Sequence, residues 1–165
     1  MKDTRIILAI DPGVASMGYA VVMARRRAFK VMDYGCTRTK AGEEFAGRLL
    51  KLFQACVLLA RKHKATEFAV ERIFFSRNVK TAMLVAQAQG VAVLAAAMAG
   101  IKVSLYTPMQ VKMSVTGHGN ADKKSVATMT QRILGLAELP RPDDAADALA
   151  LAYCHAVSTR HGEKK

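Results

Sequence analysis

Two short apolar segments of the chain each end on a carboxylate, and this pattern limits the fold more than any other feature. Ile6 to Ile10 is apolar throughout and stops at Asp11, where a Pro-Gly pair imposes a turn. Phe68 to Val70 is likewise apolar and stops at Glu71. A continuous apolar run predicts a strand buried on both faces, so its sheet needs a covering layer on each side.

The rest of the chain alternates between strand and helix patterns. Two hairpin links, the second with its tip at Arg25 to Arg27, make the first three strands antiparallel. Strands are expected at 6–10, 18–23, 29–36, 67–70 and 102–106. Helices are expected at 43–62, 78–98, 121–134 and 143–155, with a short one opening at Pro108. This order predicts one α/β domain over 1–158, with a mixed five-stranded sheet and helices on both faces, and a disordered tail over 159–165.

The charge balance favours a polyanionic partner. The chain has 25 Lys and Arg against 13 Asp and Glu, which gives a formal charge of +12 and a pI near 10. Nucleic acid is the usual partner of such a surplus, although an anionic membrane or an assembly such as a ribosome also fits.

Cysteine usage and the apolar segments indicate a cytoplasmic protein. Cys36, Cys56 and Cys154 are odd in number and widely spaced, which favours free thiols over disulfides or a zinc site. No signal peptide is expected, because Asp11 interrupts the first apolar run too early. Thr81 to Gly100 has no charged residue, but its Gln and Gly residues favour a buried helix, shared between the core and a subunit interface, over a membrane span.

Four acids in apolar surroundings are candidate metal ligands: Asp11, Glu71, Asp144 and Asp147. The last two are three residues apart near the start of the last helix, so they share one face of it. Buried, clustered carboxylates are costly and repel one another. Divalent cations resolve both problems, and carboxylate oxygens suit Mg²⁺ or Mn²⁺.

Each acid also has a simpler explanation. Asp11 before Pro-Gly is a common turn former, and Glu71 is placed to pair with a neighbouring Arg. Asp143 and Asp144 are placed to act as N-terminal helix acids, and Asp147 to face solvent. All four together in a strongly basic chain favour the metal site.

Basic and aromatic residues near these acids are candidates for DNA contacts. Lysines on either side of the glycine-rich loop 116–120 are placed to meet phosphates or to be ordinary surface residues: Lys112, Lys123 and Lys124. Phe74, Phe75 and Arg77 follow Glu71, where an exposed ring would stack on bases and a buried one would pack in the core. His118 is explained more simply as a surface histidine than as a ligand or base.

Five motifs in order resemble the RuvC family of Holliday-junction resolvases, over about residues 6 to 155. They are Ile10-Asp11-Pro12-Gly13 with Gly18-Tyr19, Gly35-Cys36-Thr37-Arg38-Thr39, Val70-Glu71 followed by Phe74, Gln87-Ala88-Gln89-Gly90-Val91-Ala92, and Asp144-Ala145-Ala146-Asp147-Ala148-Leu149-Ala150. The sequence departs from the family pattern in its double acid at 143–144 and its double Phe. The D-A-A-D spacing favours Asp144, and the wedge residue stays open between Phe74 and Phe75.

The resemblance implies an RNase H-like fold and a homodimer that nicks two symmetry-related strands of a four-way junction in recombination and repair. It assigns metal binding and catalysis to Asp11, Glu71, Asp144 and Asp147. It places Phe74 near the junction centre, and Lys112 and Lys123 on the DNA. We expect hydrolysis with two Mg²⁺ ions, for which Mn²⁺ substitutes, giving 5′-phosphate and 3′-hydroxyl ends. A branch-migration motor is a possible further partner.

Two other functions fit parts of the pattern. An actin-like ATPase also has a strand followed by Asp-x-Gly, but that fold needs two such domains and the chain supplies one. A non-catalytic junction-binding module fits the charge, but it has no need for all four acids.

Overall fold

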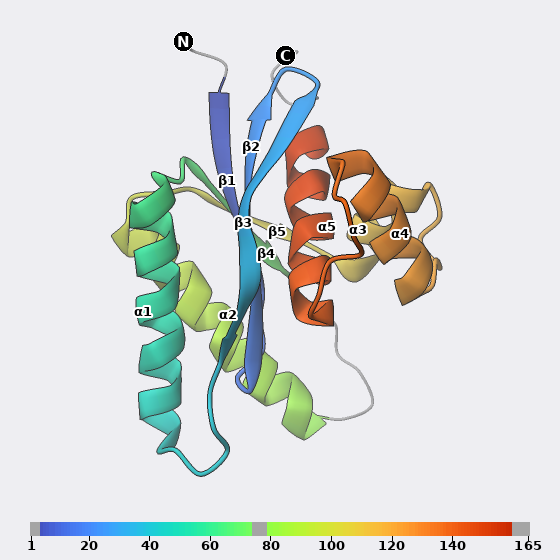
Figure 1. Cartoon of the computed structure of the whole chain (residues 1–165). Coiled ribbons are helices and arrows are strands. Elements are labelled where there is room, and N and C mark those ends of the chain that lie inside the picture. Colours follow the sequence, from blue (N-terminus) through green and yellow to red (C-terminus); the bar gives the residue numbers. More distant parts are fainter. Residues whose placement is uncertain (1–3, 74–78, 160–165) are drawn as a thin grey trace.

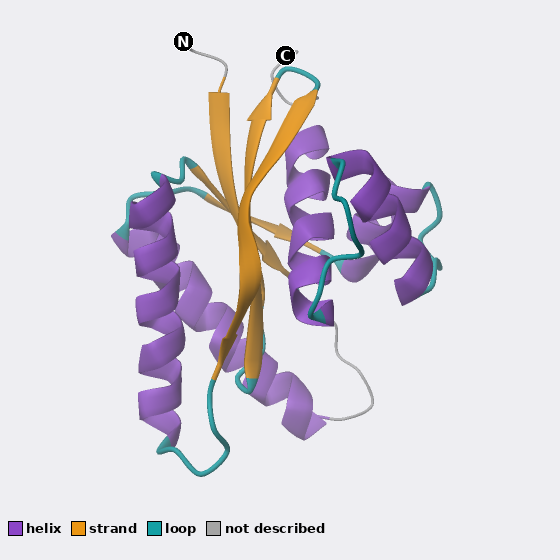
Figure 2. Ribbon diagram, viewed as in Figure 1, coloured by secondary structure: helices purple, strands orange, loops and turns teal. Residues whose placement is uncertain are grey.

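A mixed five-stranded sheet forms the centre of the computed structural model, which describes residues 4–73 and 79–159 (Figures 1 and 2). The strand order is β3-β2-β1-β4-β5. The strands are β1 (Thr4–Asp11), β2 (Ser16–Arg25), β3 (Ala28–Arg38), β4 (Glu67–Glu71) and β5 (Val103–Tyr106). The three N-terminal strands are antiparallel, whereas β1, β4 and β5 run parallel, which confirms the predicted mixed sheet.

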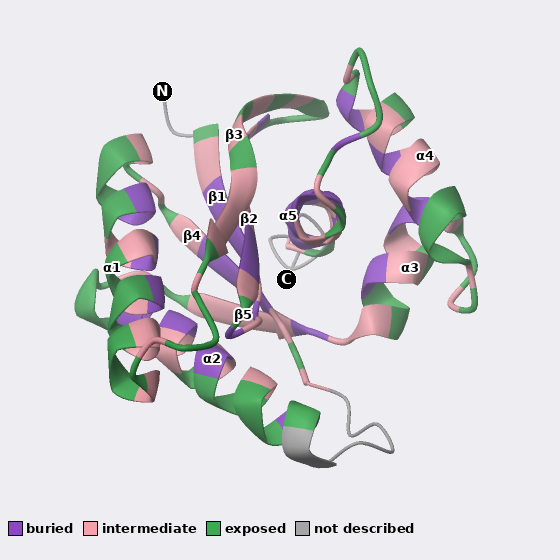
Figure 3. Ribbon diagram, turned by 60° about the horizontal axis from the view of Figure 1, so that its bottom comes forward, coloured by how far each residue is buried: buried purple, intermediate pink, exposed green. Residues whose placement is uncertain are grey.

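Helices cover both faces of the sheet, as predicted. They are α1 (Phe45–His63), α2 (Val79–Met98), α3 (Pro108–Thr116), α4 (Lys123–Leu134) and α5 (Asp143–Ser158). Helices α1 and α2 pack on one face, and α5 packs on the other, between the sheet and the α3–α4 pair (Figure 3).

Strand β1 contributes to both cores, which explains its unbroken apolar sequence. Leu8 and Ile10 lie in the core beneath α1 and α2, while Ile7 and Ala9 lie in the core beneath α5. All four side chains are fully buried. Because successive side chains alternate between faces, each strand residue belongs predictably to one core or the other.

One local prediction needs correction. The helix expected from residue 121 starts at Lys123, because Asp122 accepts a hydrogen bond from the Ser125 amide and caps it. The helix over 78–98 was expected to divide its surface between the core and a subunit interface, and one side of α2 does pack in the core, through alanines such as Ala88 and Ala92. Its other side is apolar and exposed, including Met98 at 71%.

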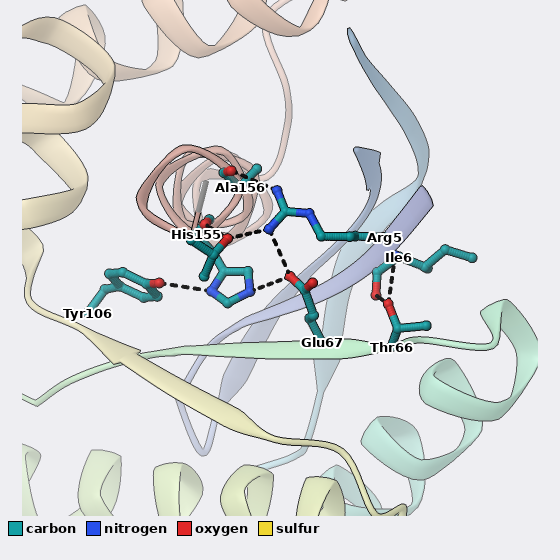
Figure 4. A network of polar contacts seen from close by, with 8 residues as sticks. Arg5, Ile6, Thr66, Glu67, Tyr106, His155 and Ala156 are labelled. Atoms are coloured by element: carbon teal, nitrogen blue, oxygen red, sulfur yellow. Dashed lines mark hydrogen bonds and ion pairs between the residues drawn. The ribbon is translucent and has the colours of Figure 1, made fainter. Parts of the chain in front are cut away.

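A buried polar network ties the C-terminal part of α5 to the sheet (Figure 4). Nε2 of His155 lies 2.8 Å from a Glu67 carboxylate oxygen, and Nδ1 lies 2.9 Å from the Tyr106 hydroxyl. Arg5 lies 3.4 Å from the same Glu67 oxygen and donates to the Ala156 carbonyl at 2.8 Å. The network therefore joins β1, β4, β5 and α5 at one end of the helix.

Candidate active site

The ends of two parallel strands bring the first two acids together. Residues Ile10 and Val70 are paired in the β1–β4 register, so Asp11 and Glu71 each follow at the same edge of the sheet. Ala9 and Ala69 point into the core beneath α5. Asp11 and Glu71, two residues further along, therefore face α5 as well.

Gly18 sets the position of the third acid. It is the register partner of Asp11 across the β1–β2 pair. A Cβ at Gly18 would lie 2.0 Å from the Asp144 carbonyl oxygen, so only glycine lets the start of α5 approach β2 this closely. The missing side chain thus places Asp144 beside Asp11.

The first turns of α5 carry both remaining acids on one face. Pro142 occupies the N-cap position, so Asp143 and Asp144 are first-turn residues and neither caps the helix. The Ser16 hydroxyl donates to Asp144 Oδ2 at 2.5 Å. Lys123 donates to Asp147 Oδ2 at 3.1 Å.

One cavity of about 410 Å³ contains all four carboxylates. Its lining residues are Asp11, Glu71, Pro108, Val111, Lys112, Lys123, Val126, Asp144, Asp147 and Ala150. Asp143 does not line it; this residue lies on a neighbouring cavity of about 320 Å³ with Lys124 and Arg141. The geometry therefore selects Asp144 over Asp143 as the member of this cluster.

The electrostatics of this acid cavity are unfavourable for negative charge. Burial raises the pKa of Asp11, and the carboxylates of Glu71, Asp147 and Asp144 raise it further. Burial also raises the pKa of Glu71, against the opposing effect of its hydrogen bond with Asp11 and of nearby Lys123 and Lys112. Asp11 and Glu71 are thus stabilised by sharing a proton or by gaining a cation.

The residues fit a hard divalent cation in their chemistry. Carboxylate oxygens suit Mg²⁺ or Mn²⁺, and the raised pKa values mark a cluster that lacks positive charge. Within 4–73 and 79–159, no three Asp, Glu, His or Cys side chains are already grouped closely enough to hold an ion. Asp144 and Asp147 each use one carboxylate oxygen, Oδ2, to accept from Ser16 and Lys123.

The other predicted site residues divide into three groups. Lys112 and Lys123 line the acid cavity, whereas Lys124 lines the neighbouring one. Phe74, Phe75 and Arg77 lie outside the described residues. His118 is exposed in the loop after α3 and lines neither cavity.

Sequence reasoning missed the contact between Ser16 and Asp144. The two residues are 128 positions apart, and Ser16 lies in a turn-and-strand segment with no local signal of a partner. The role of Gly18 was also missed, although its motif was noted. A glycine within a strand is the available signal, since it often marks close approach of another backbone.

Acids at the ends of the first and fourth strands and on the final helix, facing one cavity over a mixed sheet, define the RNase H-like class of nucleases. The profile described as "Crossover junction endodeoxyribonuclease RuvC" matches residues 7–155. The chain therefore belongs to the RuvC family.

Individual relatives are similar over nearly their whole length. Crossover junction endodeoxyribonuclease RuvC of Ruminiclostridium cellulolyticum is 47% identical over 157 residues, 95% of each chain. The protein of that name from Syntrophomonas wolfei is 48% identical over 154 residues, 93% of this chain and 90% of the relative. The structure of Thermus thermophilus RuvC in complex with Holliday junction substrate superposes with a TM-score of 0.91 at 36% identity, covering 96% of each chain.

Proposed function

We propose that this protein resolves Holliday junctions as a magnesium-dependent endonuclease, cutting two symmetry-related strands. The convergence of Asp11, Glu71, Asp144 and Asp147 on one cavity carries the proposal. Membership in a family of crossover junction endodeoxyribonucleases supports the substrate. The surplus of positive charge supports binding to DNA.

The four carboxylates would hold two divalent cations. When bound, the cations supply activation of the attacking water and neutralisation of charge on the scissile phosphate. Asp11 is central, because all three other acids contribute to its raised pKa. Ser16 orients Asp144 through their hydrogen bond.

Two lysines are placed to bind the scissile strand. Lys123 is 71% exposed at its side chain and pairs with Asp147, so it is free to move toward a phosphate once that carboxylate is occupied. Lys112 extends from α3 into the same cavity. Their charges would position the phosphate and stabilise the transition state, giving 5′-phosphate and 3′-hydroxyl ends.

A homodimer would match the two-fold symmetry of a four-way junction. The outward side of α2 is an apolar surface of Met83, Leu84, Leu94 and Met98, all exposed. The segment Thr81–Met98 is long and apolar enough to cross a membrane, but 28% of it is already buried inside the protein. A second copy of this chain, packed against the same surface, is the partner that fits a symmetric substrate.

Three residues predicted to contact DNA lie outside the described residues. Phe74, Phe75 and Arg77 follow Glu71 in the chain, which puts them next to the acid cavity in sequence. We assign them to DNA contacts at the junction centre. A cytoplasmic location fits a chromosomal substrate, and a branch-migration motor would supply junctions at the preferred sequence.

The direct test is incubation with a synthetic four-way junction, with and without Mg²⁺. Paired symmetric nicks that require the metal support the proposal. Asp11→Asn should lower the cleavage rate by at least about a thousandfold and leave junction binding intact, because it removes one charge at the centre of the cluster. Near-normal cutting by this variant would sink the assignment of Asp11. Binding without cutting by the unmodified protein would indicate a non-catalytic junction-binding module.

A further inference from the structure

Another cavity, distinct from the one lined by Asp143, lies beside the acid cavity and has a different character. It is lined by Thr107, Pro108, Met109, Lys112 and Gly119, and its volume is about 410 Å³. We name it the Met109 pocket. Met109 is 62% exposed, so its side chain is accessible to a ligand. Lys112 supplies the one charged side chain of the lining.

The Met109 pocket adjoins the acid cavity and shares two lining residues with it. Pro108 and Lys112 line both. A third cavity, of about 210 Å³, begins at Pro108 and leads past Glu71 toward α2. A strand bound with one phosphate at the acids would therefore pass directly over Pro108 and the Met109 pocket.

The walls of the Met109 pocket are fixed before any ligand binds. Thr107 and Gln110 form a reciprocal capping box that holds the first turn of α3. Gly117 ends the helix with a positive φ of 76°, which turns the chain back along it. A Cβ at Gly119 would lie 2.9 Å from Met109 Cγ, so the returning loop packs closely on the Met109 side chain.

The lining chemistry matches a nucleobase. A methionine thioether is polarisable and packs well on an aromatic ring face, with no sequence requirement of its own. A cavity of several hundred cubic ångströms, mainly apolar with a few polar groups, is the usual form of a small-ligand site. Lys112 at the shared rim suits the phosphate attached to that base. An apolar peptide or a lipid would gain nothing from the charge of Lys112 at the rim shared with the acid cavity.

We propose that the Met109 pocket receives one nucleobase of the cleaved strand, next to the scissile phosphate. This inference rests on the proposed function. Bases at a strand crossover lose stacking at low cost, so seating one against Met109 would fix the register of the strand over the acids. The Met109 pocket would then contribute to the preference for certain sequences at the cut.

The test combines protein variants with abasic junctions under single-turnover conditions. Synthetic four-way junctions carry one abasic nucleotide at successive positions on either side of the cleaved bond. Loss of a stacked base should slow cleavage by the unmodified protein roughly five- to tenfold at one position. Met109→Ala should slow cleavage of the intact junction by a similar factor, and should add no further loss on the junction abasic at that position.

Two further variants sharpen the result. Met32→Ala removes another exposed methionine, from the edge strand β3, and should cleave like the unmodified protein. Gly119→Ala adds a methyl group against Met109 and should reduce cleavage without removing the thioether. If the slowing of cleavage by Met109→Ala and the slowing by the abasic nucleotide multiply at every position, the two act independently and the proposal is wrong. Unchanged cleavage by Met109→Ala would also overturn it.

A second measurement separates this proposal from the nuclease assignment. 2-Aminopurine at the sensitive position reports base unstacking on binding, without Mg²⁺ and without cutting. Its fluorescence should change when the junction binds the unmodified protein. The size of that change should differ when the junction binds the Met109→Ala variant. If the unmodified protein binds but never cuts, the proposed function fails and this signal still tests the pocket. If cutting is normal and the signal is identical in both proteins, the pocket assignment alone is wrong.

Discussion

His155 is a buried polar residue whose removal should strongly weaken the fold. Its side chain is 3% exposed and bridges the Tyr106 hydroxyl and the Glu67 carboxylate, at 2.9 and 2.8 Å. Burial raises the pKa of Glu67, but the hydrogen bond from His155 and the charge of Arg5 outweigh it, so the net shift is downward. Glu67 is therefore ionised and only accepts. His155 therefore donates to Glu67 from Nε2, and its Nδ1 contacts the Tyr106 hydroxyl.

The cost of His155→Ala can be worked out from these contacts. A hydrogen bond to a charged group contributes about 1.5–3 kcal/mol, and an orphaned buried hydroxyl costs about 1–3 kcal/mol. The expected loss is about 3–5 kcal/mol, a large part of the roughly 5–15 kcal/mol that holds a domain together. Tyr106→Phe keeps the Glu67 contact, leaves one ring nitrogen unpaired and should cost about 1 kcal/mol.

Urea unfolding measures both values as shifts in midpoint at constant slope. The pH dependence gives a second check. Because the folded pKa of Glu67 is lowered, its contribution is complete above the unfolded pKa and is lost as the pH falls through the folded one. The difference between unmodified protein and His155→Ala should therefore shrink in acid. A loss below about 1 kcal/mol at neutral pH, or a difference that grows in acid, would refute this reasoning.

Three further outcomes follow from single contacts. Gly18→Ala should destabilise the protein by several kcal/mol in urea and reduce cleavage, because backbone atoms of Asp144 occupy the Cβ position. Asp33 lies 3.0 Å from both Lys62 and His63; burial raises its pKa, but these partners lower it more. Asp33→Asn should cost about 1 kcal/mol at neutral pH by the same assay, and less as the pH falls through the lowered pKa. Leu94→Asp should abolish the proposed dimer and leave a monomer in light scattering, since it charges the exposed side of α2.

Strand identity and the first two acids were predictable because their causes are local. The apolar run before Asp11 reports burial on both faces, and residues 7 to 10 are fully buried. The parallel pairing of β1 and β4 then brings Asp11 and Glu71 to one edge. Each step depends on periodicity and on how parallel strands align.

The contacts that complete the site were not predictable, because they depend on how distant segments pack. The approach of Asp144 to Gly18 requires the final helix to lie on β2, which no local pattern specifies. Helix α2 was expected to be shared between the core and a subunit interface because it lacks charge, but the sequence did not specify that its Met and Leu side chains are the ones facing outward. An uncharged sequence reports that a surface is apolar, and it does not distinguish a core from an interface with another chain.

Glu67 and Glu71 show why the site should weaken the fold that carries it. Both lie on β4, four residues apart and so on the same face, toward α5. Glu67 has His155 and Arg5 as partners and a lowered pKa, whereas Glu71 faces Asp11 and Asp147 and has a raised one. One end of α5 is held by satisfied charges, and the other brings together charges that repel.

This contrast predicts that a variant that cannot cut is more stable than the unmodified protein. In a chelator, Asp11→Asn should raise the urea midpoint, by about 1 kcal/mol or more in unfolding free energy, because the amide needs neither a buried charge in a like-charged cluster nor the proton uptake that the raised pKa of Asp11 entails. Mg²⁺ should stabilise the unmodified protein, by about 2.7 kcal/mol at a hundredfold excess over its dissociation constant. It should stabilise Asp11→Asn much less. Glu67→Gln serves as the matched control on the same strand: it should lower stability and leave the response to Mg²⁺ intact. If Asp11→Asn is destabilised in chelator, repulsion is not what characterises this site, and the acids are held by contacts of another kind.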